Sequence, residues 1–115
     1  MPRKRVAVLI SGRGSNMVAL IEAAKDPAYP AEIVVVLAND PSAQGLQRAA
    51  AANIATSVVD HRGFGRDREA FERAMQRELE ARNIELVCLA GFMRLLTPWF
   101  VRQWESRMLL SLIHI

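Results

Sequence analysis

The chain has 115 residues, 51% of them hydrophobic, so it is long enough for one domain with a small core and too apolar to be disordered. Its formal net charge is +3, and the basic residues are scattered among acids except at Arg3-Lys4-Arg5. We interpret this triplet as a solvated N-terminus. Because no larger basic patch is evident, we expect no nucleic-acid partner. The single cysteine, Cys88, excludes an internal disulfide and a cysteine-cluster metal site.

The first apolar run, Val6 to Ile10, is rich in β-branched residues, which predicts a strand buried on both faces of a parallel sheet. It is too short for a signal-peptide core, and no run approaches the ~18 residues of a membrane span, so we expect a cytoplasmic protein without a membrane partner. After a turn, the chain continues as a helix that ends at Lys25-Asp26-Pro27. Its inward face carries Met17, Leu20, Ile21 and Ala24.

The middle of the chain repeats this order. Ile33 to Ala38 predicts a second buried strand, and Gln44 to Ala52 an alanine-rich helix stopped by Asn53. Its inward residues are expected to be Leu46, Ala49 and Ala50. Ile54 to Val59 predicts a shorter strand near an edge of the sheet, followed by a loop over Asp60 to Gly63.

The next helix is expected from Asp67 to Arg82, with Asn83 as its stop, because apolar residues recur every four positions and charges fill the rest. The apolar residues are Phe71, Met75 and Leu79. Leu86 to Ala90 predicts a fourth buried strand, in which Cys88 packs as a small hydrophobe. Thr97-Pro98 predicts the start of a short helix with three inward residues, Phe100, Val101 and Trp104.

Strand and helix therefore alternate along the chain, which predicts a single α/β domain over residues 1–115. We expect an open, mostly parallel sheet with helices on both faces. In such sheets ligands bind beyond the carboxyl ends of the strands. Four segments are the candidates for a site: Ser11 to Asn16, Asn39-Asp40, Asp60 to Gly63, and Gly91 to Leu96.

The turn after the first strand suits a phosphate. The N–H groups at a helix N-terminus are unpaired and attract anions, and Gly12 and Gly14 remove Cβ atoms that would keep a ligand away. Ser15 and Asn16 are expected to cap the helix or to bind the ligand directly. A tight turn that binds nothing is the alternative. A dinucleotide fingerprint is incomplete because Met17 stands at its third glycine, and Ser15 stands where a phosphate-binding loop needs lysine.

Apolar residues also follow the fourth strand directly, at Phe92, Met93, Leu95 and Leu96. At the rim of a sheet they either cover the core or line a pocket, and the pattern alone favours core cover. Arg94 among them is expected to extend to solvent or to pair with an acidic ligand. His61, in a polar loop with no evident partner, is interpreted as an ordinary surface histidine.

Two stretches, Val8 to Asn16 and Leu89 to Pro98, together resemble the phosphoribosylglycinamide formyltransferases, folate-dependent enzymes of purine synthesis with a Rossmann-like fold. Ile54-Ala-Thr56 and Arg68-Glu-Ala-Phe71 also fit, so that the resemblance covers residues 5–109. It implies that Gly14, Ser15 and Asn16 hold the phosphate of glycinamide ribonucleotide, and Gly12 joins them on the chemistry of the turn described above. It also implies that 10-formyltetrahydrofolate binds at Arg68 and at Met93, Arg94, Leu95 and Leu96.

The resemblance implies formyl transfer from 10-formyltetrahydrofolate to the glycinamide amine, in the biosynthesis of IMP. This reaction needs an acid or base and stabilisation of a tetrahedral oxyanion, and no metal. The expected partners are therefore two small molecules, and both a monomer and a homodimer remain open. Two other functions also remain open. One is a nucleotide-binding half-domain without catalysis. The other is a dinucleotide-dependent oxidoreductase with Asp40 bonding a ribose.

The resemblance ends after Arg107-Met-Leu109, where the family pattern continues with asparagine, isoleucine and histidine. Leu110 and Leu112 occupy the catalytic positions, and His114 comes two places late, so we assign no catalytic residue. We expect an inactive N-terminal fragment, truncated on its C-terminal side, whose fourth strand has an unpaired edge. Residues 110–115 resemble a translated sequencing adapter, and we expect them to be a non-native tail.

Overall fold

The computed structural model describes residues 3–110 and has the predicted α/β alternation. The elements in chain order are β1 (Lys4–Ile10), α1 (Ser15–Ala24), β2 (Ala31–Ala38), α2 (Gln44–Ala51), β3 (Ala55–Val58), the 3-10 helix η1 (His61–Phe64), α3 (Arg68–Ala81), β4 (Leu86–Leu89), α4 (Pro98–Gln103) and β5 (Met108–Leu110). No helix within residues 3–110 is long and apolar enough to cross a membrane.

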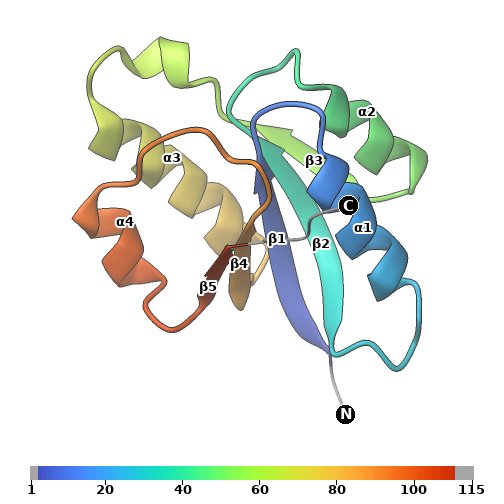
Figure 1. Ribbon diagram of the computed structural model, residues 1–115. Helices are drawn as coiled ribbons and strands as arrows, with labels where there is room; N and C mark the ends of the chain where they lie inside the picture. The colour runs from blue at the N-terminus through green and yellow to red at the C-terminus, as the bar shows by residue number, and fades with distance from the viewer. Residues whose placement is uncertain (1–2, 111–115) are drawn as a thin grey trace.

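The strands form one parallel sheet in the order β3-β2-β1-β4-β5. Helices α1 and α2 lie on one face of the sheet, and α3 and α4 on the other (Figure 1). The reason is the handedness of the crossovers, because the chain first steps outward from β1 to β3 and then returns to β4 on the opposite side of β1. The predicted open sheet, covered on both faces, and the edge position of the third strand are confirmed.

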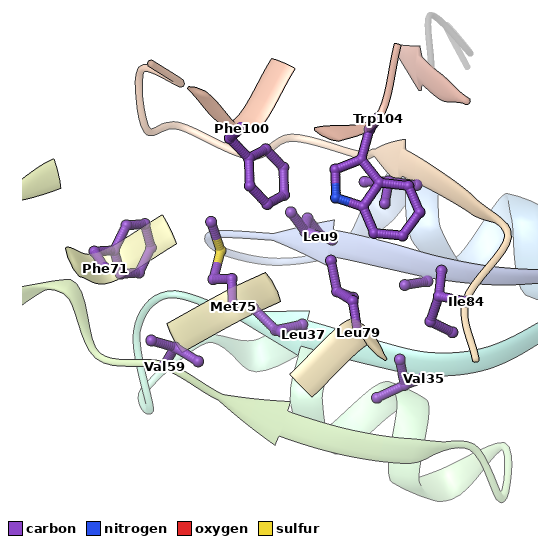
Figure 2. Close-up of a cluster of buried hydrophobic side chains, with 12 residues drawn as sticks. Leu9, Val35, Leu37, Val59, Phe71, Met75, Leu79, Ile84, Phe100 and Trp104 are labelled. Carbon is purple, nitrogen blue, oxygen red and sulfur yellow. The ribbon is translucent and has the colours of Figure 1, made fainter. Parts of the chain in front are cut away.

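The central strand β1 divides the core in two, because successive side chains point to opposite faces. Ala7 and Leu9 belong to the cluster under α3 and α4, whereas Val6, Val8 and Ile10 belong to the cluster under α1 and α2. The first cluster is drawn in Figure 2 and joins the sheet to five of the residues predicted to face inward, which are Phe71, Met75, Leu79, Phe100 and Trp104.

Helix ends follow the sequence signals closely. Asn53 and Asn83 take left-handed conformations (φ 63° and 54°) just beyond α2 and α3, as expected of the residues that stop these helices.

Three local expectations were wrong. Ala50 and Val101 are exposed, because Ala49 and Phe100, one position earlier, face the core in these short helices. Where a loop was expected over Asp60 to Gly63, the chain forms η1, and the Asp60 carboxylate caps it by accepting the backbone N–H of Arg62.

Strand β5 was not predicted, and it covers the outer edge of β4 with the parallel pairs Val87–Met108, Cys88–Leu109 and Leu89–Leu110. The expected unpaired edge on the fourth strand is therefore wrong. Of the expected tail, the backbone of Leu110 forms the end of β5, and residues 111–115 lie outside the described part of the chain.

The basic N-terminus is bound to the fold rather than simply solvated. The Arg3 guanidinium donates to the backbone carbonyls of Ala24, Tyr29 and Ala31 at 2.6, 3.1 and 2.5 Å, closing the connection between α1 and β2. Arg5 donates twice to the carbonyl of Arg82, just beyond α3. Cations at helix C-termini satisfy carbonyls that the helix itself leaves unpaired. The expectation of a solvated end was wrong for these two arginines.

A buried carboxyl group joins α3 to α4. Glu72 belongs to the helix face expected to be exposed, yet it is 0% exposed. Its two carboxyl oxygens accept the backbone N–H of Thr97 at 2.6 Å and the Thr97 hydroxyl. Thr97 therefore does not cap α4 through its side chain. The start of α4 is thus held against α3 by a buried polar group that loses its partners if the two helices separate.

Replacing Glu72 by Gln tests this attachment. The amide of Gln keeps one oxygen that can accept, but its nitrogen cannot accept the second hydrogen bond from Thr97. One buried donor is then left unpaired, and we expect the free energy of unfolding to fall by about 1–3 kcal/mol. Glu80→Gln, an exposed change on the same helix, is the matched control, with an effect below about 0.5 kcal/mol. Urea unfolding measures both variants. Equal stability of the two variants would show that the Glu72 contacts do not anchor α4.

Candidate functional site

The four predicted rim segments follow β1, β2, β3 and β4 at their carboxyl ends, which lie at one edge of the sheet. Between the loops after β1 and β4 the structure has a cleft of about 250 Å³. Its walls come from Gly12 to Asn16 on one side and from Ala90, Gly91 and Met93 on the other. Strands β1 and β4 are neighbours whose following helices cover opposite faces, so the cleft occupies the switch point of the sheet.

The floor of this cleft is the N-terminus of α1. Gly14, not Ser15, is the N-cap residue, and the helix has no side-chain cap, so the expected capping role of Ser15 was wrong. The first intrahelical bond runs from the Val18 N–H to the Gly14 carbonyl at 2.9 Å. Within residues 3–110 the backbone N–H groups of Ser15 and Asn16 have no acceptor. They remain available to an anion, which the helix dipole favours at this end.

The two glycines of the turn serve different purposes. Gly14 has a left-handed φ of 74°, and a Cβ there would lie 3.0 Å from the Cα of Gly45. A Cβ on Gly12 would meet no atom within 4 Å, so its absence leaves room in the cleft rather than within the protein. Only Gly12 therefore matches the expectation that a missing Cβ gives space to a ligand.

Gly45, near the start of α2, is a site residue that sequence reasoning missed. Its N–H donates to the Gly12 carbonyl at 3.0 Å, and a Cβ on it would lie only 2.4 Å from the Cδ1 of Ile10. Helix α2 thus packs directly against the turn, because Gly45 has no side chain to separate them. An isolated glycine within an alanine-rich helix was the available signal, since it often marks close packing.

Hydrogen bonds connect the four rim segments. The Met93 N–H donates to Ser11 Oγ at 2.7 Å, and the Ser11 hydroxyl donates to Asn39 Oδ1 at 2.6 Å. Asn39 Nδ2 lies 3.0 Å from His61 Nδ1. His61 is half-buried and has a partner, so its interpretation as an ordinary surface histidine was wrong. Sequence reasoning placed Asn39 at the rim but assigned no role to Ser11 or to this network.

The acidic residues of the rim are engaged with the protein itself. Hydrogen bonds from the backbone and hydroxyl of Ser42 lower the pKa of Asp40, and those from the side chain and backbone of Arg62 lower the pKa of Asp60. Arg62 also lies 3.6 Å from Asp40. A carboxylate used in this way is poorly placed to bind a ribose, and Met17, at the third position of the dinucleotide fingerprint, is fully buried.

The apolar segment after β4 divides between two roles. Phe92 and Leu96 pack against the core, as the sequence pattern favoured, whereas Met93 and Leu95 are 80% and 74% exposed. Met93 lines the cleft opposite the segment from Gly12 to Asn16, which we call the glycine turn. Of these two exposed apolar side chains, only Met93 borders the cleft.

The remaining predicted residues lie apart from the turn. Arg68 and Arg94 line a separate open pocket of about 380 Å³ together with Gly65 and Arg66, the last of which was not predicted. Among residues 3–110 none of these three arginines forms an ion pair with an acid. A wider depression of about 760 Å³ adjoins it along the start of α3. Leu95 and Leu96 line neither the cleft nor the arginine pocket.

Comparison with known proteins gives consistent results. A family model described as formyl transferase matches residues 4–114. The trifunctional purine biosynthetic protein adenosine-3 of Chironomus tentans is 50% identical over 111 residues, which cover 95% of this chain and 8% of that protein. The phosphoribosylglycinamide formyltransferase of Escherichia coli is 40% identical over 104 residues, covering 90% of this chain and 49% of that protein.

Among solved structures, the phosphoribosylglycinamide formyltransferase from Brucella melitensis superposes with a TM-score of 0.89 at 46% identity. The match covers 93% of this chain and 55% of that one. The chain thus spans about half the length of these bacterial relatives and less than a tenth of the trifunctional insect protein.

The two glycines of the turn provide a matched pair of variants. Gly14→Ala places a Cβ in a left-handed conformation, which costs about 1–2 kcal/mol, and forces it against Gly45, so we expect at least that loss in the free energy of unfolding. Gly12→Ala meets open space, and its effect should stay within about 0.5 kcal/mol. Chemical denaturation decides this, and similar losses for the two variants would contradict the division of roles.

Proposed function

The chain belongs to the formyl transferase family, and from this premise we propose that its protein transfers the formyl group of 10-formyltetrahydrofolate to the amine of glycinamide ribonucleotide, in the biosynthesis of IMP. We propose that residues 3–110 hold the two substrates. One observation carries the proposal: the glycine turn and Met93 form the two walls of one cleft. A hydrogen bond from the Met93 N–H to Ser11, the residue just before the turn and 82 positions away in the chain, joins the two walls.

The turn is suited to the phosphate of the ribonucleotide. Free N–H groups at the start of α1 point to where an anion is most stable, and Gly12 leaves the approach open. The exposed Ser15 hydroxyl and the half-buried Asn16 amide supply further hydrogen bonds. This arrangement fixes the phosphate and leaves the amine end of the substrate free to face the loop after β4.

The segment after β4 is suited to the folate. The exposed faces of Met93 and Leu95 offer apolar contact to a flat heteroaromatic ring, and the backbone between them offers hydrogen-bonding groups. Arg68 and Arg94, which face one open pocket without acidic partners, are suited to the carboxylates of the donor. The formyl carbon would then lie between the two substrate positions, near Gly91 and Met93.

The described residues bind without supplying the chemistry. The amine must attack the formyl carbon, and the tetrahedral oxyanion that results must be stabilised. The bond from the formyl carbon to the folate nitrogen must then break, while the amine loses a proton and the folate nitrogen gains one. The cleft that residues 3–110 form is lined by neither an acid nor a histidine. We therefore assign no catalytic residue here and propose that the 115-residue chain alone binds its substrates without turnover.

The two alternative functions predict different results. A nucleotide-binding half-domain would bind the ribonucleotide and ignore the folate. A dinucleotide-dependent oxidoreductase would bind NAD, and the engagement of Asp40 with Ser42 and Arg62 disfavours this reading. No contact among the described residues favours either alternative over formyl transfer.

Calorimetric titration of the 115-residue chain tests the proposal. We expect binding of glycinamide ribonucleotide and of 5-formyltetrahydrofolate, a stable isomer of the donor, no binding of NAD, and no formyl transfer. Arg68→Ala removes a charge-assisted contact and should weaken the folate by roughly ten- to hundredfold, whereas Arg77→Ala, further along the same helix, should leave it unchanged. Binding of NAD alone, or equal effects of the two arginines, would overturn the assignment, and measurable turnover would overturn the division between binding and catalysis.

A further inference from the structure

The segment from Gly91 to Leu96 forms few hydrogen bonds with the rest of the described residues. Before it, the Ala90 N–H donates to the Leu9 carbonyl at 3.0 Å, and after it Thr97 is held by Glu72. Between these two anchors, the only hydrogen bond from the segment within residues 3–110 is the one from the Met93 N–H to Ser11 Oγ. Phe92 and Leu96 pack against the core, whereas the exposed Met93 between them is held by this one hydrogen bond, so its position in the cleft depends on where the Ser11 hydroxyl lies.

Ser11 is in turn fixed by a buried amide. Asn39 is 4% exposed, and a buried amide without partners is costly, so both ends of its side chain need hydrogen bonds. One end contacts Ser11 and the other contacts His61 Nδ1. The backbone supports the same contacts, since the His61 N–H donates to the Asn39 carbonyl at 3.2 Å.

The hydrogen bonds of this network run in one direction, from Met93 to His61, because Ser11 has only one proton to donate. Ser11 has one hydroxyl proton, and because its oxygen accepts from Met93, that proton is free to go to Asn39 Oδ1. The amide nitrogen of Asn39 then faces His61 Nδ1, which must present a lone pair. This requires a neutral imidazole with its proton on Nε2. The opposite tautomer would instead donate from Nδ1 to the Asn39 carbonyl, which also lies 3.0 Å away.

We propose that Ser11, Asn39 and His61 are positioning residues that hold the segment from Gly91 to Leu96 against the glycine turn, through one directed chain of hydrogen bonds from Met93 to His61. None of these three side chains lines the cleft itself. The consequence for folate binding rests on the proposed function, whereas the hydrogen-bond chain does not.

Nuclear magnetic resonance of the ¹⁵N-labelled 115-residue chain tests the chain of bonds without any ligand. At a pH where His61 is neutral, its ring nitrogens should report a proton on Nε2 and none on Nδ1. Ser11→Ala should accelerate hydrogen exchange at the Met93 amide by about fivefold, the loss expected for one hydrogen bond. Ser11→Thr, which keeps the hydroxyl, should restore the slower exchange.

Ser57→Ala is the matched control, because Ser57 also donates its hydroxyl at 2.6 Å, to Glu78, away from the rim. It should leave exchange at Met93 unchanged. A proton on Nδ1 of His61, or Met93 exchange that ignores Ser11→Ala, would overturn the proposal. Exchange accelerated equally by Ser57→Ala would do the same, because it would show a general loss of stability.

Measuring folate binding by the same Ser11 variants separates this proposal from the proposed function. Affinity for 5-formyltetrahydrofolate should fall several-fold in Ser11→Ala, and recover in Ser11→Thr. If wild-type chain does not bind the folate while Met93 exchange still responds to Ser11, the function fails and the positioning role stands. If the folate binds the wild type and Ser11→Ala equally well, with Met93 exchange unaltered, the positioning role fails and the function stands.

Discussion

The site depends on one constraint, the parallel pairing of β1 with a strand on each side. Right-handed crossovers carry α1 to one face of the sheet and α3 and α4 to the other, so the loops after β1 and β4 diverge and cannot fill the space between them. The cleft between the glycine turn and Met93 is that space. Its location is therefore a property of the strand order, and its chemistry comes from the few residues that border it.

Three contacts give the diverging loops a fixed shape. Behind the turn, a Cβ on Gly14 would lie 3.0 Å from the Cα of Gly45, and a Cβ on Gly45 would lie 3.2 Å from the Cα of Gly14, so the start of α1 packs tightly against α2. On the other wall, Glu72 anchors Thr97 and the hydrogen bond to Ser11 anchors Met93. The free N–H groups and the exposed apolar side chains thus lie on a framework in which the buried polar side chains of Glu72 and Asn39 have hydrogen-bond partners.

Most of the fold was predictable because alternating strands and helices bury residues with clear periods, as Phe71, Met75 and Leu79 show. The rim segments were predictable for the same reason, since parallel strands place their carboxyl ends together. Glu72 was not, because its role depends on a contact with Thr97 that no local pattern encodes. Gly45 had a local signal as an isolated glycine in an alanine-rich helix, but its contact with Gly12 could not be read from that signal. Strand β5 follows a short helix, and its three residues have too little pattern to identify. The partner of His61, Asn39, lies 22 positions away in the chain, so the sequence around His61 did not indicate this hydrogen bond.

The most direct measurement is a ¹⁵N chemical-shift titration of the 115-residue chain with glycinamide ribonucleotide. If the start of α1 holds the phosphate, the largest shifts should occur at the backbone amides of Ser15 and Asn16, with smaller ones at Gly91 and Met93 across the cleft, and inorganic phosphate should reproduce the first set only. Shifts concentrated at Arg66, Arg68 and Arg94, with the amides of Ser15 and Asn16 unmoved, would contradict the account.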